Sequence, residues 1–568
     1  MVNPLSPGIQ IKEYNSTTSV PSVATTSAGL VGKFNWGPVD DIMTVSDENV
    51  LLTKVTEPDS NTYVYFFMAA NFLSYGNDLK LIRSGAAGLK NASANGSGLL
   101  IKNETDYTQN YSSGANTYGM FAAKWAGDKG NSLKVSVYAS ANTQNFNNWI
   151  YNGYFQAAPN TSTYATNVNG ANDELHIVVV DEDGKFSGTA NTVLEAFGFL
   201  SKASDAQNSD GSTNYYKDVI NQRSQYIWWL SHPDAGLGWA NTTSWGQPAA
   251  GVTFGAGDNH DYTISLTNGV YASSVDANTM ISQALFKNKD ILDVSFLIGA
   301  DYSSTVLTDL IQNVAEYRQD ALVTISPQMN DVVNNSGQEA TAVVATRNSL
   351  PSSSYAIMDS GWKYQYDKYN DTYRWLPLSA DIAGVCVRTD LNRDPWWSPA
   401  GYNRGQINNV VKLAWNPNQT DRDTLYKNGV NPVVNFLGQG PILYGDKTML
   451  SRPSAFDRIN VRRLFIVLEK QIGEASKSSL FEFNDSFTRA QFVALIEPFL
   501  RDVQGRRGIQ DFKVVCDETN NTPTVIMANQ FVGDIYIKPN YSINYIRLNF
   551  VAVGPNLDFN EVIGKFGE

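Results

Sequence analysis

Few residues of this chain have the types and spacing of a catalytic or metal site. The three histidines, His176, His232 and His260, are far apart, and no motif links them to a serine or a cysteine. Neither HExxH nor CxxC spacing occurs, so we expect no zinc site. The run Asp181-Glu182-Asp183-Gly184 is similar to the start of a calcium loop, but its glycine comes too early and no glutamate stands at the twelfth place. We interpret that run as a hairpin turn.

Three other patterns deserve the same test. The segment Gly29-Leu30-Val31-Gly32-Lys33 is too short for a phosphate loop, and Phe34 replaces the required Ser or Thr. Asp258, His260 and Asp261 could bind a cation, although a plain turn is the better interpretation. Carboxylate pairs for glycoside hydrolysis need only proximity in the fold, so the sequence leaves them open and indicates none. The sequence therefore predicts no catalytic residue, no metal site and no cofactor.

Composition indicates a large assembling protein. A chain of 568 residues is too long for one core, so we expect two to four domains. Charged residues make up only 17% and aromatic residues 12%, a balance that suits a β-rich protein with extensive protein contacts. The net charge of −13 argues against nucleic acid as the main partner, because phosphate binding needs clustered Lys and Arg.

Compartment and thiol state follow from the same sequence. No apolar run reaches the roughly 18 residues of a membrane span, and the first residues lack a basic region with an apolar core. We therefore expect neither membrane insertion nor secretion, and assembly in a cytoplasm. Cys386 and Cys516 each lie in an apolar, strand-like run, which predicts two buried thiols and no disulfide framework.

Hydrophobic periodicity predicts the elements of the first two thirds of the chain. It indicates strands at 28–34 and 79–85 with a helix at 62–76 between them, and two strands in 121–140. A hairpin turning at Asp183-Gly184 should precede a helix at 191–203, whose apolar face would hold Val193, Leu194, Phe197 and Leu200. A strand–helix–strand unit in 281–327 implies a parallel pair, with a helical stripe of Leu310, Ile311, Val314 and Tyr317.

Two amphipathic helices follow at 461–472 and 488–503. The second should begin with a capping box of Thr488 and Gln491, be kinked by Pro498 and end at Gly505 and Gly508. Residues 534–553 alternate like paired strands broken at Pro539. Beyond them the last residues have no core pattern, and neither do residues 1–22 apart from a strand-like start, so both ends are expected to be arms.

The segment 375–448 has the most unusual sequence. The cluster Trp396-Trp397-Ser398-Pro399-Ala400-Gly401 combines rigid proline turns with two bulky anchors, and later glycines separate short apolar strands. Aromatic pairs such as Trp228-Trp229 and Trp396-Trp397 favour core packing over an interface or a stacking site. Ser398 has no base beside it, so we interpret this segment as one that shapes a surface.

In its order of motifs the chain resembles the tail sheath proteins of contractile bacteriophage tails. The family shows an "AG..AR.D" step, a "W.(A/S)PAG" cluster, a "G(I/V)N" strand and a "G.G..(V/L).G.(K/R)T" hairpin, and Val387 here departs from the usual Ala before the Arg. The N-terminal SPGIQIKEY, the central AKWAGDKGNSLKVSV and the two C-terminal helices are similar as well. The family-motif residues are Gly384, Arg388, Asp390, Trp397, Pro399, Ala400, Gly401, Asn431, Gly438, Gly440, Gly445 and Thr448.

Pattern and resemblance together imply an α+β multidomain fold: an α/β sheet-plus-helix core, a C-terminal α+β domain, a β-rich inserted domain and extended terminal arms. The expected boundaries are an N-terminal arm at 1–22, a middle domain at 23–88 and 174–340, an inserted region at 89–173, a C-terminal core domain at 341–553 and a C-terminal arm at 554–568. The residues expected to pair with neighbouring subunits are Ile9, Ile11, Tyr14, Asp558, Phe559, Val562 and Ile563.

The resemblance implies a structural function without enzymatic activity. Sheath subunits stack as hexameric rings in a helix around a tail tube, then contract and drive the tube through a cell envelope. The implied partners are further copies, the tube protein, and baseplate and terminator proteins, within a virion tail. The candidate tube- or neighbour-facing residues are Arg462, Arg463, Glu469, Lys470, Arg501, Asp502, Arg506 and Arg507.

Three alternatives stay open at this stage. The chain could be a static tail or baseplate component, or the sheath of a phage-derived injection device. An enzyme of the α/β-hydrolase kind is the alternative from another class, because a helix-covered sheet can host catalysis. Removing residues 1–22 should abolish long polymers if the chain is a sheath, and should leave folding and activity intact if it is an enzyme.

Overall fold

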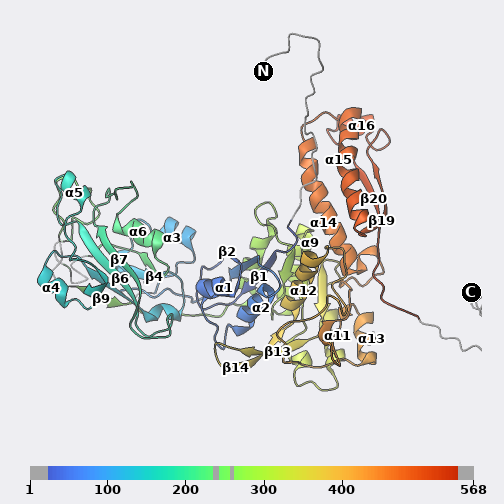
Figure 1. The fold of residues 1–568 in the computed structure, drawn as a ribbon, viewed down its shortest axis with the longest axis horizontal. Helices are drawn as coiled ribbons and strands as arrows, with labels where there is room; N and C mark the ends of the chain where they lie inside the picture. Colours follow the sequence, from blue (N-terminus) through green and yellow to red (C-terminus); the bar gives the residue numbers. More distant parts are fainter. Residues whose placement is uncertain (1–23, 97, 234–238, 240–241, 256–260, 548–568) are drawn as a thin grey trace, which may run out of the picture. The chain divides into compact units, whose positions relative to one another are not determined.

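The computed structural model describes residues 24–547, apart from 97, 234–238, 240–241 and 256–260 (Figure 1). These residues form two compact units. We call residues 24–395 and 399–477 the core unit, and residues 396–398 and 478–547 the C-terminal unit. The predicted arms at 1–22 and 554–568 lie outside the described residues, as does His260.

A seven-stranded sheet is the centre of the core unit, with strand order β16-β12-β11-β10-β1-β3-β2. All neighbours are parallel except β2 and β3, which are antiparallel. Such a sheet needs helices on its faces, and its strands are apolar runs buried along most of their length. The strands are β1 (Ala28–Gly32), β2 (Ile42–Val45), β3 (Leu79–Arg83), β10 (Phe296–Ile298), β11 (Leu322–Ile325), β12 (Ala356–Asp359) and β16 (Val430–Asn431).

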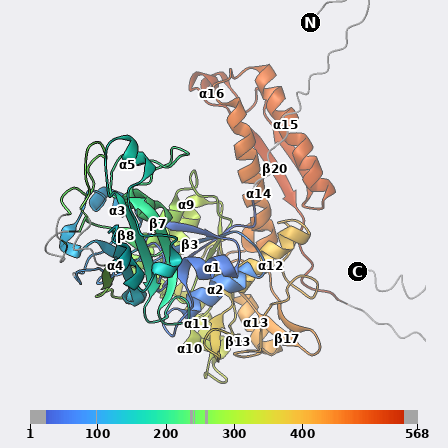
Figure 2. The same cartoon turned by 60° about the vertical axis from the view of Figure 1, so that its left-hand side comes forward.

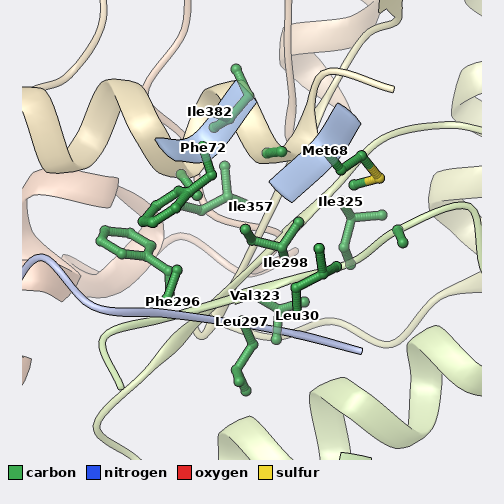
Figure 3. Packing of buried hydrophobic residues seen from close by; sticks show 14 of the residues in the cluster. Leu30, Met68, Phe72, Phe296, Leu297, Ile298, Val323, Ile325, Ile357 and Ile382 are labelled. Atoms are coloured by element: carbon green, nitrogen blue, oxygen red, sulfur yellow. The ribbon is translucent and has the colours of Figure 1, made fainter. Parts of the chain in front are cut away.

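Helices α2 (Tyr63–Leu73) and α12 (Ser379–Asn392) pack on each other and on this sheet. Figure 3 shows Met68 and Phe72 of α2 and Ile382 of α12 beside strand residues of the same buried cluster. The strand–helix–strand prediction for 281–327 is confirmed, because β10 and β11 pair in parallel. Leu310, Ile311 and Val314 of the intervening helix are buried, but Tyr317 is 71% exposed and does not belong to the stripe.

The other helices of the core unit are shorter or peripheral, apart from one long helix near its end. They are α1 (Glu48–Val55), α3 (Glu104–Asn110), α4 (Thr143–Asn148), α5 (Thr163–Asn167), α6 (Tyr216–Arg223), α7 (Asp276–Gln283), α8 (Ser304–Asp309), α9 (Glu316–Arg318), α10 (Met329–Val332), α11 (Glu339–Ser349), α13 (Gln419–Lys427) and the long α14 (Ile459–Ser476). A π-helix, Leu310–Ala315, joins α8 to α9.

The chain between β3 and β10 builds a β-rich region with its own buried cluster. Its main sheet is antiparallel, in the order β7-β6-β5-β9, and β4 pairs separately with β8. The strands are β4 (Phe121–Ala123), β5 (Leu133–Tyr138), β6 (Glu174–Asp181), β7 (Thr192–Ser201), β8 (Ile227–Trp229) and β9 (Tyr262–Ser265). A hairpin does form here, because β6 pairs with β7, but its connection spans residues 182–191, so the segment after Gly184 that was expected to be the second strand belongs to the connection.

The helix predicted at 191–203 is wrong, because this segment is β7. Val193 and Leu200 sit at helical spacing, yet β7 has two irregularities in its register with β6, at Leu175/Ile177 and at Val179/Val180. A bulge shifts which side chains face the core and so disturbs the strict alternation that marks a strand. Pairing with the buried β6 strand decides the conformation, and tertiary context overrides the local pattern.

Two smaller sheets complete the core unit. Strands β13 (Trp362–Asp367) and β14 (Thr372–Pro377) form a hairpin to which β15 (Lys412–Leu413) adds. Strands β17 (Val433–Phe436) and β18 (Gly440–Leu443) form the glycine-bounded hairpin expected from the sequence. The run around Cys386 is not a strand but part of α12, although both cysteines are buried, free thiols as predicted.

The C-terminal unit consists of one long helix on a two-stranded sheet, with a short helix in the connection between the two strands. Figures 1 and 2 show α15 (Ser486–Gly505) alongside β19 (Ile509–Val515) and β20 (Asp534–Pro539), and α16 (Pro523–Met527) belongs to the connection between the strands. Helix α15 continues through Pro498 and ends at Gly505. Its N-cap is Asp485, which accepts the backbone N–H of Thr488, so the predicted capping box is wrong.

Within the residues that the structure describes, none of the helices combines the length and the apolar composition needed to cross a membrane.

Candidate assembly surfaces

Two of the three histidines, His176 and His232, and the acidic turn at Asp181 have structural partners. His176 is fully buried; Phe199 donates its backbone N–H to Nδ1 (3.0 Å), and Nε2 donates to the carbonyl of Ala157 (2.9 Å). Burial lowers the pKa of His176, and burial together with Lys217 lowers the pKa of His232 to about 4. Both rings are therefore neutral near pH 7 and are held in place by packing.

The Asp181 carboxylate closes its own turn. It accepts hydrogen bonds from the hydroxyl of Ser132 (2.6 Å) and from the backbone N–H groups of Phe186 (2.9 Å) and Ser187 (2.7 Å). These donors occupy the lone pairs that a cation would need. Among the residues described, no three His, Cys, Asp or Glu side chains are grouped so that they could hold a metal ion.

The family motifs at 383–448 serve the packing of α12 and its neighbours. Gly384 is required by the side chain of Tyr75, because a Cβ at this position would lie 2.3 Å from Cδ2 of the ring. The Tyr75 hydroxyl donates to Asp381 (3.0 Å) and accepts the backbone N–H of Asn408 (2.7 Å). Lys363 completes this buried group with an ion pair to Asp381 at 2.9 Å. Gly384 thus allows the buried polar group to form between α2, α12 and β13.

Asn431 and Gly445 form the next motif contact. The Asn431 side chain donates to the carbonyls of Met358 and Lys447 and accepts the backbone N–H of Lys447 at 2.7 Å. A Cβ on Gly445 would lie 2.9 Å from the Asn431 Oδ1 and 3.1 Å from its Cα. The two residues therefore lock the end of strand β16 to the chain that follows β18.

Two residues of α14 that were predicted to contact the tube or a neighbouring subunit, Arg462 and Arg463, make their contacts within this chain. Arg463, only 4% exposed, forms an ion pair with Asp390 of α12. Burial raises the pKa of Asp390, and the guanidinium of Arg463 opposes that shift. Arg462, also 4% exposed, lies 4.5 Å from the ring centroids of both Tyr355 and Phe456. These two arginines attach α14 to the rest of the core unit and have little exposed surface left for a partner.

The remaining members of that set are more accessible. Lys470 pairs with Asp293, and the Glu469 side chain is 54% exposed. In the C-terminal unit, Arg501 and Asp502 lie on the exposed face of α15 and form (i, i+4) pairs with Glu497 and Arg506 respectively. Exposed pairs of this kind contribute about 0–1 kcal/mol to stability, so a partner could exchange them at low cost.

Trp396 and Trp397 hold the end of α15. The Trp396 indole N–H donates to the carbonyl of Arg506 at 3.2 Å, and the Arg506 guanidinium lies 5.1 Å from the Trp396 ring centroid. Arg507 lies 5.4 Å from the ring centroid of Trp397. Two of the predicted contact residues, Arg506 and Arg507, are thus part of the packing that links the tryptophan motif to the C-terminal helix.

The β19–β20 sheet presents unpaired strand edges. Among the described residues, β19 and β20 pair only with each other, in antiparallel register from Ile509 with Pro539 to Val515 with Asp534. Helix α15 packs on β19, while most side chains of both strands are exposed or half-buried. An open edge offers a row of backbone donors and acceptors to a further strand.

One apolar surface was not predicted from the sequence. Before and at the start of α15, Leu480, Phe481, Phe483 and Phe487 are all more than 60% exposed. Large exposed apolar patches mark interaction sites in soluble proteins. The sequence signal was three phenylalanines in a short polar run, FEFNDSF, without the spacing of a helix or strand.

Comparison with known proteins identifies the family. Family models match residues 297–449 as a phage tail sheath protein central domain and residues 451–552 as a phage tail sheath C-terminal domain. The chain is 33% identical to the tail sheath protein of Vibrio phage KVP40 and 32% identical to that of Enterobacteria phage T4, in each case over 99% of this chain and 100% of the relative.

Solved structures agree at the level of the fold. A sheath tail protein from Listeria innocua superposes with a TM-score of 0.53 at 9% identity, covering 91% of this chain and 96% of that protein. A sheath tail protein from Desulfitobacterium hafniense gives 0.51 at 12% identity, covering 90% and 94%. The resemblance carried by the motifs is therefore confirmed, and the α+β multidomain fold class with it. The chain belongs to the phage tail sheath protein family.

Proposed function

We propose that this chain is the structural subunit of a contractile sheath, which polymerises as a helical stack of hexameric rings around the tail tube. Contraction of that polymer drives the tube through the host envelope. The partners are further copies of the chain, the tail tube protein, and baseplate and terminator proteins. The subunit is made and assembled in the host cytoplasm and becomes part of the virion tail.

The observation that carries this proposal is that β19 and β20 have no further pairing strand among the described residues, in a chain with strand-like segments near both ends. Ile9 and Ile11 alternate as strand residues do, Tyr14 follows three residues later, and Phe559, Val562 and Ile563 supply apolar side chains at the other end. An arm that adds to an open edge gains several backbone hydrogen bonds, each contributing about 0.5–1.5 kcal/mol net.

Arms that reach different neighbours produce a polymer and not a closed pair. Donation to a neighbour that does not donate back is a heterologous contact, which continues into rings or open helices. One added strand is a weak link, but a subunit that gives and receives two arms is held by several links at once. Flexible arms also keep neighbours connected while folded units move as rigid bodies, which contraction requires.

The contact set for a tube or neighbour is narrower than the sequence suggested. Because Arg462 and Arg463 are buried, we assign the contacts to the exposed residues Glu469, Arg501 and Asp502, together with the apolar surface at 480–487. Phenylalanines at the centre of an interface are typical energetic anchors, while exposed charges set orientation.

Electron microscopy of the purified protein tests the proposal. We compare the intact chain, a chain lacking residues 1–22, and a full-length chain with Ile9→Pro and Ile11→Pro, which removes two strand N–H donors. The matched control, Ile9→Thr and Ile11→Thr, keeps those donors and the strand propensity. We expect striated hollow tubes from the intact chain and the control, and none from the proline and deletion variants.

The outcomes separate the mechanism from the function. Tubes of normal length without residues 1–22 would show that the N-terminal arm does not link subunits. If the intact chain remained monomeric with the tube protein present, the sheath function itself would be wrong. Tubes seen in an extended and a shorter, wider form would distinguish a contractile sheath from a static tail component.

A further inference from the structure

A second exposed apolar surface lies on the core unit, over α7 and the 3₁₀ helix Ala284–Lys287 that follows it. The buried face of this segment holds Thr279, Ser282, Gln283 and Phe286. The water-facing side of a surface helix is usually polar, but here it carries large apolar side chains, with Ile281 and Leu285 four positions apart. We call this surface, with its apolar neighbours, the α7 surface; its exposed apolar residues are Val275, Ile281, Leu285 and Ile291.

Lysines give the α7 surface its unpaired charge. Lys287 is half-buried and Lys289 is exposed, and neither forms an ion pair with another residue that the structure describes. The carboxylates of the same stretch interact with other residues of the chain: Asp276 with Ser303, Asp290 with Lys477 and Asp293 with Lys470. The α7 surface is therefore apolar with a positive margin.

The apolar surface at 480–487 has the opposite charge. Its charged residues are Glu482 and Asp485, both exposed. Asp485 caps α15, whereas Glu482 has no ion pair within the described chain. Aromatic rings beside a carboxylate that lacks a cation complement an apolar helix face beside lysines that lack an anion.

The backbone holds the 480–487 surface in a defined shape. The Asn484 side chain donates to Oδ1 of Asn521 (3.0 Å) and to the carbonyl of Gln530 (2.8 Å), which fixes the segment to the connection between β19 and β20. Phe481 has a φ of 68°, a conformation that bulky residues rarely adopt, and its side chain is fully exposed. Unfavourable backbone and an aromatic ring in water are offset when a partner covers the ring.

We propose that the apolar surface at 480–487 of one copy binds the α7 surface of a second copy. Phe481 and Phe483 pack against the apolar helix face, and Glu482 lies beside Lys289. Since one surface meets a different surface, the contact is heterologous and repeats along a polymer. This inference rests on the assembly proposed above and names the partner of its apolar contact; both complementary halves are present on the same chain.

Cross-linking between two populations of the full-length chain tests the contact. One population carries Phe483→Cys and the other Ile281→Cys, and a short bismaleimide reagent links thiols that lie close together. Both native cysteines are buried, so the new thiols are the accessible ones. The control mixture contains Val411→Cys in place of Ile281→Cys; Val411 lies in the core unit outside the α7 surface and is 59% exposed, against 62% for Ile281.

We expect the mixture of Phe483→Cys and Ile281→Cys to give a covalent dimer, in polymers and in concentrated solution, at roughly ten times the control yield or more. Neither variant alone should give a dimer, because the two surfaces differ. Circular dichroism checks that each variant keeps its fold. A yield no higher than the control in both conditions would overturn the proposal, and so would an equal yield from Phe483→Cys alone.

Charge reversal checks the pairing in the same assay. Glu482→Lys in the first population, or Lys289→Glu in the second, should lower the dimer yield roughly fivefold to tenfold, because each places like charges together. Both reversals in one mixture should restore the yield. A combined loss larger than either single loss would contradict the contact between these two residues.

The outcomes separate this contact from the sheath function. Polymers that form without this dimer would refute the contact and leave the sheath function standing. A dimer without polymers, even with the tube protein present, would support the contact and refute the sheath function. If Phe481→Ser with Phe483→Ser polymerised normally but no longer bound the tube protein, the tube would be the occupant and this proposal would be wrong.

Discussion

Replacing Gly384 with alanine should destabilise the core unit despite the higher helix propensity of alanine. The new Cβ would lie 2.3 Å from Cδ2, 2.6 Å from Cγ and 3.0 Å from Cβ of Tyr75. These atoms are at the base of the side chain, so a change of ring rotamer does not relieve the overlap, and α12 must move away from the chain after α2.

The size of the effect follows from what that movement disrupts. Overpacking a tight core costs about 1–3 kcal/mol. Displacing Tyr75 also weakens its hydroxyl contacts with Asp381 (3.0 Å) and with the N–H of Asn408 (2.7 Å), at about 1 kcal/mol or more each. The gain in helix propensity returns only about 1 kcal/mol. We therefore expect Gly384→Ala to lower the free energy of unfolding by about 2–5 kcal/mol.

The chain offers a matched control. Gly473 lies inside α14, and a Cβ built there meets no atom within 4 Å, so Gly473→Ala should stabilise the protein by about 0.5–1 kcal/mol. Urea unfolding of the monomeric protein, followed by circular dichroism and tryptophan fluorescence, measures both variants. If Gly384→Ala were as stable as Gly473→Ala, the close approach to Tyr75 would not constrain this position and the explanation of the motif glycine would fail.

Two further predictions concern buried ionisable groups. Lys363→Met should lower the free energy of unfolding by about 3–5 kcal/mol, because it leaves Asp381 buried without its ion pair. In a double-mutant cycle, adding Asp381→Leu should recover part of that loss. Strictly additive effects of the two substitutions would contradict the coupling. Burial raises the pKa of Asp359 to about 8, above its value in the unfolded chain. The contribution of this group to the free energy of unfolding is therefore complete below about pH 4. It falls by about 1.4 kcal/mol for each pH unit between about pH 4 and pH 8. Asp359→Asn has no carboxyl group that titrates, so the wild type should lose stability relative to this variant between pH 5 and pH 8 when both are unfolded in urea. If the free energies of unfolding of the two proteins changed in parallel with pH, the assignment would be refuted.

Prediction of the fold from sequence worked where strands are buried on both faces and failed where a strand is irregular. Continuous apolar runs at 28–34 and 79–85 correctly indicated β1 and β3. In β7, two register shifts against β6 place Phe197 and Leu200 at helical spacing although the backbone is extended. The run around Cys386 shows the opposite error, a helix predicted as a strand. Its small and β-branched residues are typical of a strand, but α12 needs small residues there to approach Tyr75.

The exposure of the candidate contact residues was harder to predict from the sequence than the fold. Charge and helical position suggested that Arg462 and Arg463 face a partner. Their burial depends on Tyr355, Phe456 and Asp390, which come from separate elements and cannot be connected to α14 by local sequence patterns. A guanidinium is weakly hydrated and stacks on aromatic rings, so its charge alone is poor evidence of exposure. The contact of the tryptophan motif with the end of α15 joins segments about 110 residues apart, so local sequence patterns could not predict it.

The course of the chain bears on how a sheath subunit could transmit force. The described chain passes from the core unit to the C-terminal unit after Pro395, returns after Ser398, and leaves the core unit again after Lys477. Within the described chain three peptide connections therefore join the two units, and in the assembly proposed above a load on β19 and β20 could reach the core unit through them. Pro395 and Pro399 restrict the backbone at two of them, and the Trp396 indole is hydrogen-bonded to the end of α15. In the assembly proposed above, the prolines would stiffen these connections, and the rings of Trp396 and Trp397 would anchor the motif to the end of α15.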